Sequence, residues 1–318
     1  MCANKRLSKM VISKNINNIT QLDRSALTMG SFDGMHVGHM EVLNTLTSLA
    51  HKKDIPTVVI TFDPHPKTVI NKNGQEKWLN ITTANKKLEI LEKNGIDYVW
   101  LVPFDNDFAS ITAQYFMDNY IIEYFKPEDI IIGYDHHFGN KREGDAEFLS
   151  KHSEKYNYKL HVIEPSKINN ISISSTQIRQ FIEKCNVESA NNFLGWNYEL
   201  SGQVVKGRGV GNKIKFPTAN VNPGNKNKLI PGKGAYCVDV LVDNQKYLGM
   251  CNIGVRPTLY ETGRIVIEVH LITENTLSLL NKNIKLNFKS FIRKEKKYEN
   301  TNELVKQLEL DRQLCISN

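Results

Sequence analysis

The hydrophobic pattern of this 318-residue chain changes its period near residue 198, and that change limits the folds open to it. Before this point, short apolar runs alternate with helical patterns. The runs 56–62 and 129–134 are nearly continuous in apolar residues, as expected for parallel strands that are covered on both faces. Strands are expected over residues 26–29, 56–62, 98–104, 129–134 and 160–164, and helices near 38–50, 83–95, 111–124 and 144–156.

This alternation of strand and helix predicts an α/β fold, a doubly wound parallel sheet that binds its ligands at the carboxyl ends of the strands. Beyond residue 198, the runs 236–243, 247–253, 265–271 and 284–292 alternate polar and apolar residues without helices between them. This second pattern is typical of an antiparallel β-barrel or sandwich.

Two helical patterns complete the expected organisation. One spans residues 177–194 and joins the two halves, and the other spans 302–315, with Leu304, Leu308 and Leu314 expected to dock on the barrel. Together with the length of the chain, this predicts two domains, residues 1–184 and residues 185–318.

The composition indicates a globular protein with anionic partners. The chain is 40% hydrophobic and 24% charged, with a formal net charge of +7, which favours nucleotides and leaves nucleic acid open. No apolar run approaches the roughly 20 residues of a membrane span, so a cytoplasmic location is expected. The five cysteines show no metal-binding or redox spacing, which argues for a reducing compartment and against a disulfide framework or a structural zinc site.

Residues 29–39 read Met-Gly-Ser-Phe-Asp-Gly-Met-His-Val-Gly-His, between a strand pattern and a helix pattern. A strand, a glycine turn and a helix aim backbone N–H groups and the helix dipole at a phosphate. Gly30 and Gly34 permit the sharp turn and the close approach of phosphate oxygens. His36 and His39 lie on one face of the helix start, where imidazoles donate hydrogen bonds to phosphate oxygens during phosphoryl or nucleotidyl transfer.

Two other interpretations of this segment stay open at this level. It is compatible with an ordinary strand-to-helix turn that carries two surface histidines. A zinc pair is a weaker alternative, because no cysteine lies near and a glycine-rich approach to a helix suits an anion better.

Further candidates fall at other predicted strand ends. Ser174, Ser175 and Thr176 are good helix N-cap residues whose hydroxyl and N–H groups can hold a phosphate, and Arg179 follows one turn later. The aromatic rings at three strand ends offer a flat apolar surface for a ring system, although any one of them is compatible with a core position. These rings belong to Phe62, Phe104 and Phe108.

These pieces, in this order and spacing, resemble the H-x-G-H nucleotidyltransferases and, among them, the bacterial bifunctional riboflavin kinase/FMN adenylyltransferases, or FAD synthetases. The resemblance implies an ATP site in the first half. Its residues would be Gly30, Phe32, Asp33, Gly34, His36, His39, Asp135, Ser174, Ser175, Thr176 and Arg179, with His36, His39 and Arg179 as catalytic groups.

The second half opens on a glycine-rich segment, Gly207-Arg-Gly-Val-Gly211, which is followed by Phe-Pro-Thr-Ala-Asn at 216–220. This segment resembles the ATP loop and magnesium motif of riboflavin kinases. The resemblance implies that Gly207, Gly211 and Pro217 contact ATP and that Thr218 and Asn220 bind Mg²⁺, a cation that prefers oxygen ligands.

Glu268 lies inside an apolar strand pattern, where a carboxylate is costly unless it is paired or used. It is a candidate base for the ribityl hydroxyl that attacks the γ-phosphate. From the alternation alone, a glutamate on the solvated face of a barrel is an equally good interpretation.

The resemblance therefore predicts an enzyme that makes FMN from riboflavin with MgATP and then FAD from FMN and ATP. The expected partners are these small molecules, with no nucleic acid and no membrane, in a monomer or weak homo-oligomer. The chain departs from the family pattern at His136, Gln177, Lys215 and 272–273. One alternative is thus the same fold with a single activity, and another is a flavin- or nucleic-acid-binding regulator.

Overall fold

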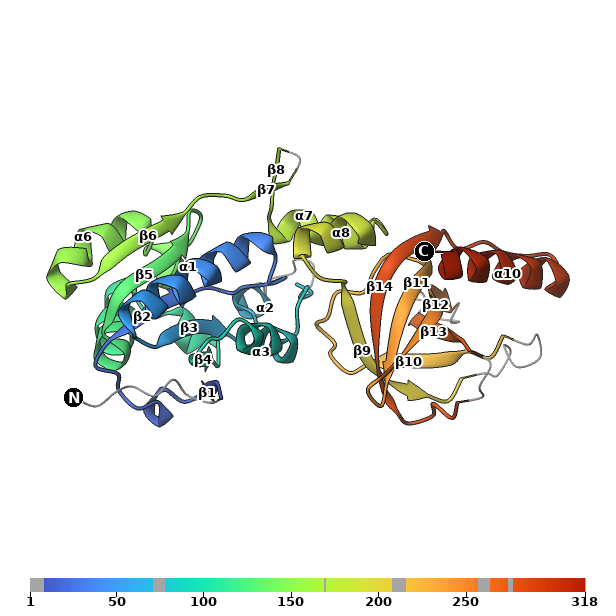
Figure 1. Cartoon of the computed structure of the whole chain (residues 1–318), viewed down its shortest axis with the longest axis horizontal. Helices are drawn as coiled ribbons and strands as arrows, with labels where there is room; N and C mark the ends of the chain where they lie inside the picture. The colour runs from blue at the N-terminus through green and yellow to red at the C-terminus, as the bar shows by residue number, and fades with distance from the viewer. Residues whose placement is uncertain are drawn as a thin grey trace. The chain divides into compact units, whose positions relative to one another are not determined.

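The computed structural model divides into two compact units, Met1–Ser175 and Thr176–Asn318 (Figure 1). The structure describes residues 9–70, 78–168, 170–207, 216–256, 264–273 and 277–317. Each unit has its own sheet and its own core, and the two are treated separately below. Among these described residues, no helix combines the length and the apolar character that a membrane span needs.

The first unit is built on a six-stranded parallel sheet, with the order β1-β4-β3-β2-β5-β6. Its strands are β1 (Val11–Ser13), β2 (Ser25–Met29), β3 (Thr57–Phe62), β4 (Tyr98–Val102), β5 (Pro127–Gly133) and β6 (Lys159–Ile163). The predicted doubly wound sheet is confirmed. The edge strand β1 was not predicted, because three residues are too few to show a period.

Helices cover both faces of this sheet (Figure 1). On one face, Leu43 and Leu46 of α1 pack in a core with Leu91 of α3. On the other face, Phe116, Phe125 and Leu149 pack in a second core, from α5, the π-helical segment that continues it and α6. The bounds are α1 (Val37–Lys53), α2 (Pro66–Ile70), α3 (Ala84–Lys93), α4 (Asn106–Ala109), α5 (Ala113–Phe116), the π-helix (Met117–Phe125) and α6 (Ala146–Tyr156).

The strand order places a topological switch point between β2 and β5. The chain runs from β2 to β3 on one side, whereas β5 pairs with β2 on the other side. In open α/β sheets the crevice for a ligand lies at the carboxyl ends of the strands at such a point. The loops that leave Met29 and Gly133 both begin there.

The amino end of the same sheet carries a buried ion pair. Asp129 is 1% exposed, and its two oxygens accept hydrogen bonds from Lys53 Nζ at 2.5 Å and from His161 Nε2 at 2.8 Å. Burial on its own raises the pKa of this carboxyl, but the bonds from Lys53 and His161 outweigh it and hold the pKa below its usual range.

We expect Asp129→Asn to lower the free energy of unfolding of the first unit at neutral pH by about 1–3 kcal/mol, because it strips two hydrogen-bonded partners of their carboxylate. A carboxyl with a depressed pKa stabilises the fold above its unfolded pKa, and this stability is lost as the pH falls through the folded pKa. Urea unfolding should therefore show a difference between wild type and variant that shrinks below about pH 4.

Glu128→Gln is the matched control for this experiment. Glu128 pairs on the surface with Arg24 at 2.9 Å and with the same Lys53 at 3.5 Å, and such exposed pairs contribute about 0–1 kcal/mol. Equal losses in the two variants at neutral pH would contradict the special role of the buried carboxylate.

The second unit is a closed antiparallel barrel, with the order β10-β13-β12-β11-β14-β9, so the barrel expectation is confirmed. Its strands are β9 (Glu199–Val205), β10 (Ala219–Pro223), β11 (Gly234–Val242), β12 (Gln245–Arg256), β13 (Arg264–Ile272) and β14 (Asn283–Arg293). The helical pattern over 177–194 forms two helices, α7 (Ser175–Glu183) and α8 (Val187–Leu194), which Cys185 separates with a φ of 66°. Phe181 and Phe193 join them by an edge contact.

The terminal helix α10 (Thr301–Ser317) docks on the barrel through a different face from the predicted one. Leu308 packs as expected, but Leu314 is 49% exposed, and Val305 and Cys315 take part instead. Asp311, 1% exposed, forms a two-pronged ion pair with Arg293 of β14.

Cys315 of α10 forms a disulfide bond with Cys237 of β11, and both residues are buried. This bond contradicts the expectation, drawn from cysteine spacing, that the chain has no disulfide. The two cysteines are 78 residues apart, and a separation of that size gives no sequence signal for pairing.

Candidate functional site

The loop that leaves β2 turns through an unusual backbone conformation. Phe32, Gly34 and Met35 have φ angles of 48°, 92° and 42°, the left-handed region that side chains rarely adopt. Phe32 and Met35 are nevertheless buried, which helps to hold them there. Such backbone strain is kept only where neighbouring structure imposes it, and it is common at ligand sites.

The segment before α3 imposes this conformation. The buried carboxylate of Asp33 accepts hydrogen bonds from the N–H groups of Ile81 at 2.9 Å and Thr82 at 3.0 Å. The hydroxyl of Thr82 in turn accepts the N–H of Gly34 at 2.8 Å. Asp33, predicted to contact ATP, is therefore placed to shape the loop, and its main-chain oxygen accepts the hydroxyl of Ser175 at 2.7 Å.

The two histidines cap the start of α1 together. His36 is the N-cap residue, and its Nδ1 accepts the N–H of His39 at 3.3 Å. The Nδ1 of His39 accepts the N–H of His36 at the same distance, so the pair forms a reciprocal capping box. The rings stack with centroids 3.6 Å apart.

This arrangement decides the protonation of both rings. A nitrogen that accepts from a backbone N–H carries no proton, so a neutral imidazole here has its proton on Nε2. Burial lowers the pKa of His36 to about 4, and burial, His36 and Lys87 together hold the pKa of His39 well below its usual value. The helix dipole also disfavours a cation at this end. The site thus presents two neutral Nε2–H donors at a helix N-terminus.

We expect His36 to stay neutral from about pH 7 down to about pH 5, because a buried imidazole loses more hydration on protonation than an exposed one. Ring ¹⁵N signals of labelled protein, assigned by comparison with a His36→Asn variant, report the protonation state directly. A titration of His36 with its midpoint above about pH 6 would contradict the neutral pair.

Sequence reasoning did not identify Lys87, which lies against the same loop. The ammonium group of Lys87, 4% exposed, donates to the Ser31 oxygen at 2.7 Å and to the Thr61 hydroxyl at 3.0 Å. In the sequence Lys87 is one of several lysines on α3, and its position one turn before the buried Leu91 is the only signal that it faces inward.

The loop after β5 begins at the other side of the switch point. Asp135, predicted to line the ATP site, is exposed directly after the strand. His136 stacks on Phe138, and burial lowers the pKa of His136 to about 4, so this departure from the family pattern places a neutral aromatic ring there. Gly139 is required, since it has a φ of 74° and an added Cβ would lie 2.7 Å from the backbone nitrogen of Ala113.

The three predicted flavin-binding rings come together at the carboxyl ends of β3 and β4. Phe62 contacts Phe104 and Phe108 with ring centroids 5.4 Å and 6.2 Å apart. A cavity of about 600 Å³ opens beside Phe108, with Tyr115 and Tyr120 in its wall. The cavity is open to solvent, and its wall combines the three aromatic rings of Phe108, Tyr115 and Tyr120 with polar side chains.

The segment from Ser174 to Arg179 crosses the boundary between the units. Ser174 and Ser175 belong to the first unit, and Ser175 reaches the loop through Asp33 as described above. Thr176 and Arg179 belong to α7 in the second unit, so their place at the ATP site stays a prediction.

On the barrel, three polar residues lie in register on three neighbouring strands. Glu268 of β13 pairs in register with Asn220 of β10 on one side and with Asn252 of β12 on the other. Residues paired in register point to the same face of a sheet, so these side chains form one row. Ile267 and Val269 are buried on the opposite face, and Glu268 is half-buried.

The segment that carries the predicted metal ligands is fixed to the same strand. His270 Nδ1 donates to the main-chain oxygen of Pro217 at 2.9 Å, directly before the exposed Thr218. Gly207 packs on Asn220, since an added Cβ would lie 2.2 Å from Nδ2 of that amide. Thr218, Asn220 and Glu268 are thereby brought to one side of the barrel, whereas Gly211 and Lys215 lie outside the described residues.

These donors fit a magnesium ion. A hydroxyl, an amide oxygen and a neighbouring carboxylate are hard oxygen ligands, and Mg²⁺ takes one or two of them together with water and substrate phosphates. Within the described ranges, no group of three or more His, Cys, Asp and Glu side chains gathers as a metal-binding cluster.

Comparison with known proteins assigns a family to each part of the chain. A family model described as FAD synthetase matches residues 18–177, and one described as riboflavin kinase matches residues 194–317. Bifunctional riboflavin kinase/FMN adenylyltransferases from Buchnera aphidicola (subspecies Schizaphis graminum) and Listeria monocytogenes are 34% and 33% identical to it. The alignments cover 95% of this chain and 96% of the first relative, and 90% of both chains for the second.

A solved structure, named as a macrolide-efflux protein from Streptococcus pneumoniae, superimposes with a TM-score of 0.87 at 29% sequence identity. The match covers 96% of this chain and 98% of that chain, so both units are shared. Its name describes that protein alone.

Proposed function

The chain belongs to the family of bifunctional riboflavin kinase/FMN adenylyltransferases, and from this premise we propose how its residues perform the two reactions. It phosphorylates riboflavin to FMN with ATP, and it adenylylates FMN to FAD with release of pyrophosphate. We assign adenylylation to residues 1–184 and phosphorylation to residues 185–318; the stretches matched by the two family models, 18–177 and 194–317, support this division.

In adenylyl transfer, a phosphate oxygen of FMN forms a bond to the α-phosphorus of ATP. The bond to the bridging oxygen breaks, and pyrophosphate leaves with its electron pair, so no covalent enzyme intermediate is needed. The Nε2–H groups of His36 and His39 donate to phosphate oxygens that gain charge in the transition state. Because the rings are neutral and held by their Nδ1 atoms, they act as fixed hydrogen-bond donors.

The other groups of this site bind the substrates. ATP lies along the loop from Gly30 to Gly34, with Phe32 and Asp135 beside it. Its phosphates meet the helix start at Ser174, Ser175 and Thr176, and Arg179 neutralises part of their charge. FMN places its ring against the aromatic cluster of Phe62, Phe104 and Phe108, and a cavity of about 600 Å³ opens beside Phe108.

In the kinase reaction, Glu268 accepts the proton of the terminal ribityl hydroxyl as that oxygen attacks the γ-phosphorus of ATP and ADP leaves. Gly207, Gly211 and Pro217 contact ATP, and Thr218 and Asn220 hold Mg²⁺. The ion, when bound, neutralises charge on the phosphates. Supporting this assignment, Glu268 and Asn220 are register partners, so base and metal ligand lie beside one another.

The observation that carries the proposal is the reciprocal histidine box at the start of α1, because it presents two neutral donors where a phosphate binds. The test is to incubate purified protein with riboflavin and MgATP, and separately with FMN and MgATP, and to resolve the flavins and pyrophosphate. We expect FMN and FAD from the first mixture and FAD with pyrophosphate from the second. FMN formation alone would support the single-activity alternative, and neither product would overturn the proposal.

Partners and location follow from the same proposal. The small molecules riboflavin, FMN and ATP are the substrates, and we propose a monomer or weak homo-oligomer in the cytoplasm, without nucleic acid. The disulfide between Cys237 and Cys315 is compatible with this location because both sulfurs are buried away from soluble thiols.

A further inference from the structure

Lys87 is a buried cation that the two reactions described above leave without a role. It lies in the first turn of α3 and is 4% exposed. Its three donor protons have three partners: the Ser31 oxygen at 2.7 Å, the Thr61 hydroxyl at 3.0 Å and the Phe62 oxygen at 3.3 Å. Burial of an ammonium group costs free energy of folding. If Lys87 served only to fill space, an apolar residue could take its place with little loss of stability.

The three partners connect the two strand ends of the ATP site. Ser31 lies in the strained loop after β2, whereas Thr61 and Phe62 end β3. Thr61 is 0% exposed, and its own hydroxyl lies 3.4 Å from the same Ser31 oxygen. Because Lys87 binds the Ser31 carbonyl from the protein interior, it fixes the direction of that peptide and of the N–H groups that follow it.

The charge of Lys87 acts on the same site. It is close enough to His39 to lower the pKa of that ring, so it helps to keep the imidazole neutral. Burial lowers the pKa of Lys87 itself to about 8, against the opposing effect of Asp33 and Asp63. At neutral pH the ammonium group of Lys87 therefore places a positive charge behind the loop. In the proposed reaction, the negative charge of the phosphates develops on the other side of this loop.

We propose that Lys87 is a positioning residue for adenylyl transfer, which fixes the loop after β2 through Ser31 and places a buried positive charge behind the ATP phosphates. This inference rests on the proposed function of the first unit. The kinase reaction should not depend on Lys87, because the residues proposed for that reaction lie on the barrel.

The test compares Lys87→Met and Lys87→Arg with wild type, each as the full chain. Lys87→Met keeps an unbranched side chain of nearly the same length but removes its charge and its donors. We expect it to lower kcat for FAD formation from FMN by about 10- to 100-fold, with a smaller change in KM for ATP, because the charge acts mainly in the transition state. Riboflavin phosphorylation by the same sample should be unchanged.

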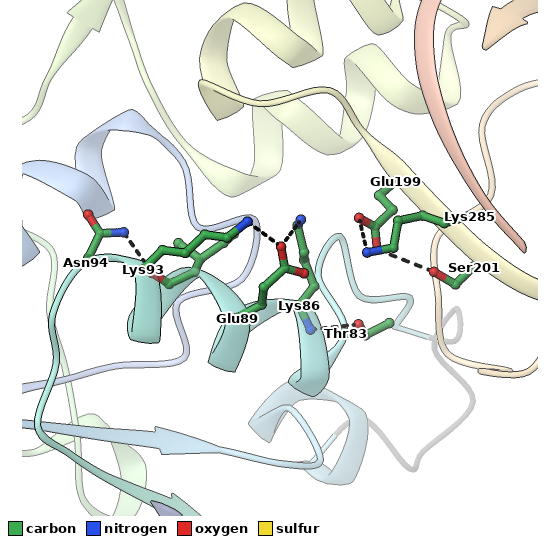
Figure 2. Close-up of polar contacts among 9 residues, drawn as sticks. Thr83, Lys86, Glu89, Lys93, Asn94, Glu199, Ser201 and Lys285 are labelled. Atoms are coloured by element: carbon green, nitrogen blue, oxygen red, sulfur yellow. Dashed lines mark hydrogen bonds and ion pairs between the residues drawn. The ribbon is translucent and has the colours of Figure 1, made fainter. Parts of the chain in front are cut away.

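The matched control is a lysine on the outside of the same helix. Figure 2 shows Lys86 and Lys93, which share the carboxylate of Glu89 at 3.2 Å and 2.7 Å. The side chain of Lys93 is 70% exposed, so Lys93→Met removes an equal charge from α3 without touching the loop. We expect this variant to form FAD at the wild-type rate.

The pH profile separates positioning by charge from simple packing. In wild type, kcat for FAD formation should fall as the pH rises through about 8, the pKa of Lys87, because the ammonium loses its charge. Lys87→Arg keeps its charge to far higher pH, so this decline should disappear while much of the activity returns. Lys87→Met should also lack the decline.

The inference is overturned if Lys87→Met forms FAD at the wild-type rate, or if the decline near pH 8 persists in Lys87→Arg. If Lys87→Met unfolds and loses both reactions, the Arg variant decides by the same profile. A wild-type protein that makes no FAD from FMN contradicts the proposed function instead, so the two failures are distinguishable.

Discussion

In a His36→Ala variant, we expect the rate of FAD formation from FMN to fall by about 100- to 1,000-fold, while riboflavin is phosphorylated at the wild-type rate. The substitution removes one of the two Nε2–H donors. It also removes the N-cap acceptor of the main-chain N–H of His39, whereas the ring of His39 keeps its bond from the main-chain N–H of residue 36. Product analysis with FMN and with riboflavin as separate substrates measures both rates in one preparation.

Two controls separate chemistry from helix stability. Loss of an N-cap costs about 1 kcal/mol on its own, so His36→Asn, which keeps a capping acceptor, should fold like wild type and still lose FAD formation. His51→Ala changes an exposed histidine in the last turn of the same helix and should leave both rates unchanged. Full FAD formation in His36→Asn would contradict the role of the imidazole.

The second large effect is expected on the barrel. Glu268→Gln should lower the rate of FMN formation from riboflavin by about 100- to 10,000-fold, since an amide cannot accept the hydroxyl proton. Adenylylation of supplied FMN should continue at the wild-type rate. The two rates are measured in separate reactions, one supplied with riboflavin and one with FMN.

Asp243→Asn is the control for that experiment, because it removes a barrel carboxylate that pairs with Lys282 at 2.6 Å in an exposed turn. Both reactions should survive it. A Glu268→Gln variant that phosphorylates riboflavin normally would show that the glutamate is only a surface residue of the barrel. Loss of both reactions in a folded Glu268→Gln or His36→Ala protein would contradict the assignment of one reaction to each unit.

Much of the fold could be predicted because its signals are local. The parallel strands β3 and β5 are continuous apolar runs, and the helical patterns predicted near 38–50, 83–95 and 144–156 coincide with α1, α3 and α6. The missed strands are those without a local signal. β1 has three residues, and β7 (Lys167–Ile168) and β8 (Ile171–Ser172) have two each. β9 and β10 flank a glycine-rich segment, and they are placed by pairing with each other and with β14 and β13.

The sites were predicted in their residue types but not in their contacts. The spacing of His36 and His39 places both at a helix start, yet the reciprocal bonds between ring and backbone depend on the N-cap geometry. The alignment of Asn220 with Glu268 depends on strand register. The two residues are 48 positions apart, so no local sequence pattern predicts that register. The spacing of Lys87 from Leu91 indicates that it faces inward, but its bond to Ser31, 56 residues away, has no local signal.

The predictions about the disulfide and about the docking face of α10 were wrong for a related reason. Both depend on which side of the last helix meets the barrel. Asp311 is buried on that side, although a prediction from apolar residues alone places a carboxylate on the solvent side. Its charge is matched by Arg293, so the helix keeps Leu308 on the barrel but turns Leu314 to solvent and brings in Val305 and Cys315.

The reciprocal box at the start of α1 has a consequence for how substitutions combine. Each imidazole is anchored by the main chain of the other histidine, so a substitution at one position leaves the hydrogen bond to the other ring in place and removes only the ring stacked on it. Because the two rings are in contact, with centroids 3.6 Å apart, the energetic effects of changing them are not expected to be simply additive. The difference between the double variant and the sum of the two single variants measures how strongly the stacked rings depend on each other.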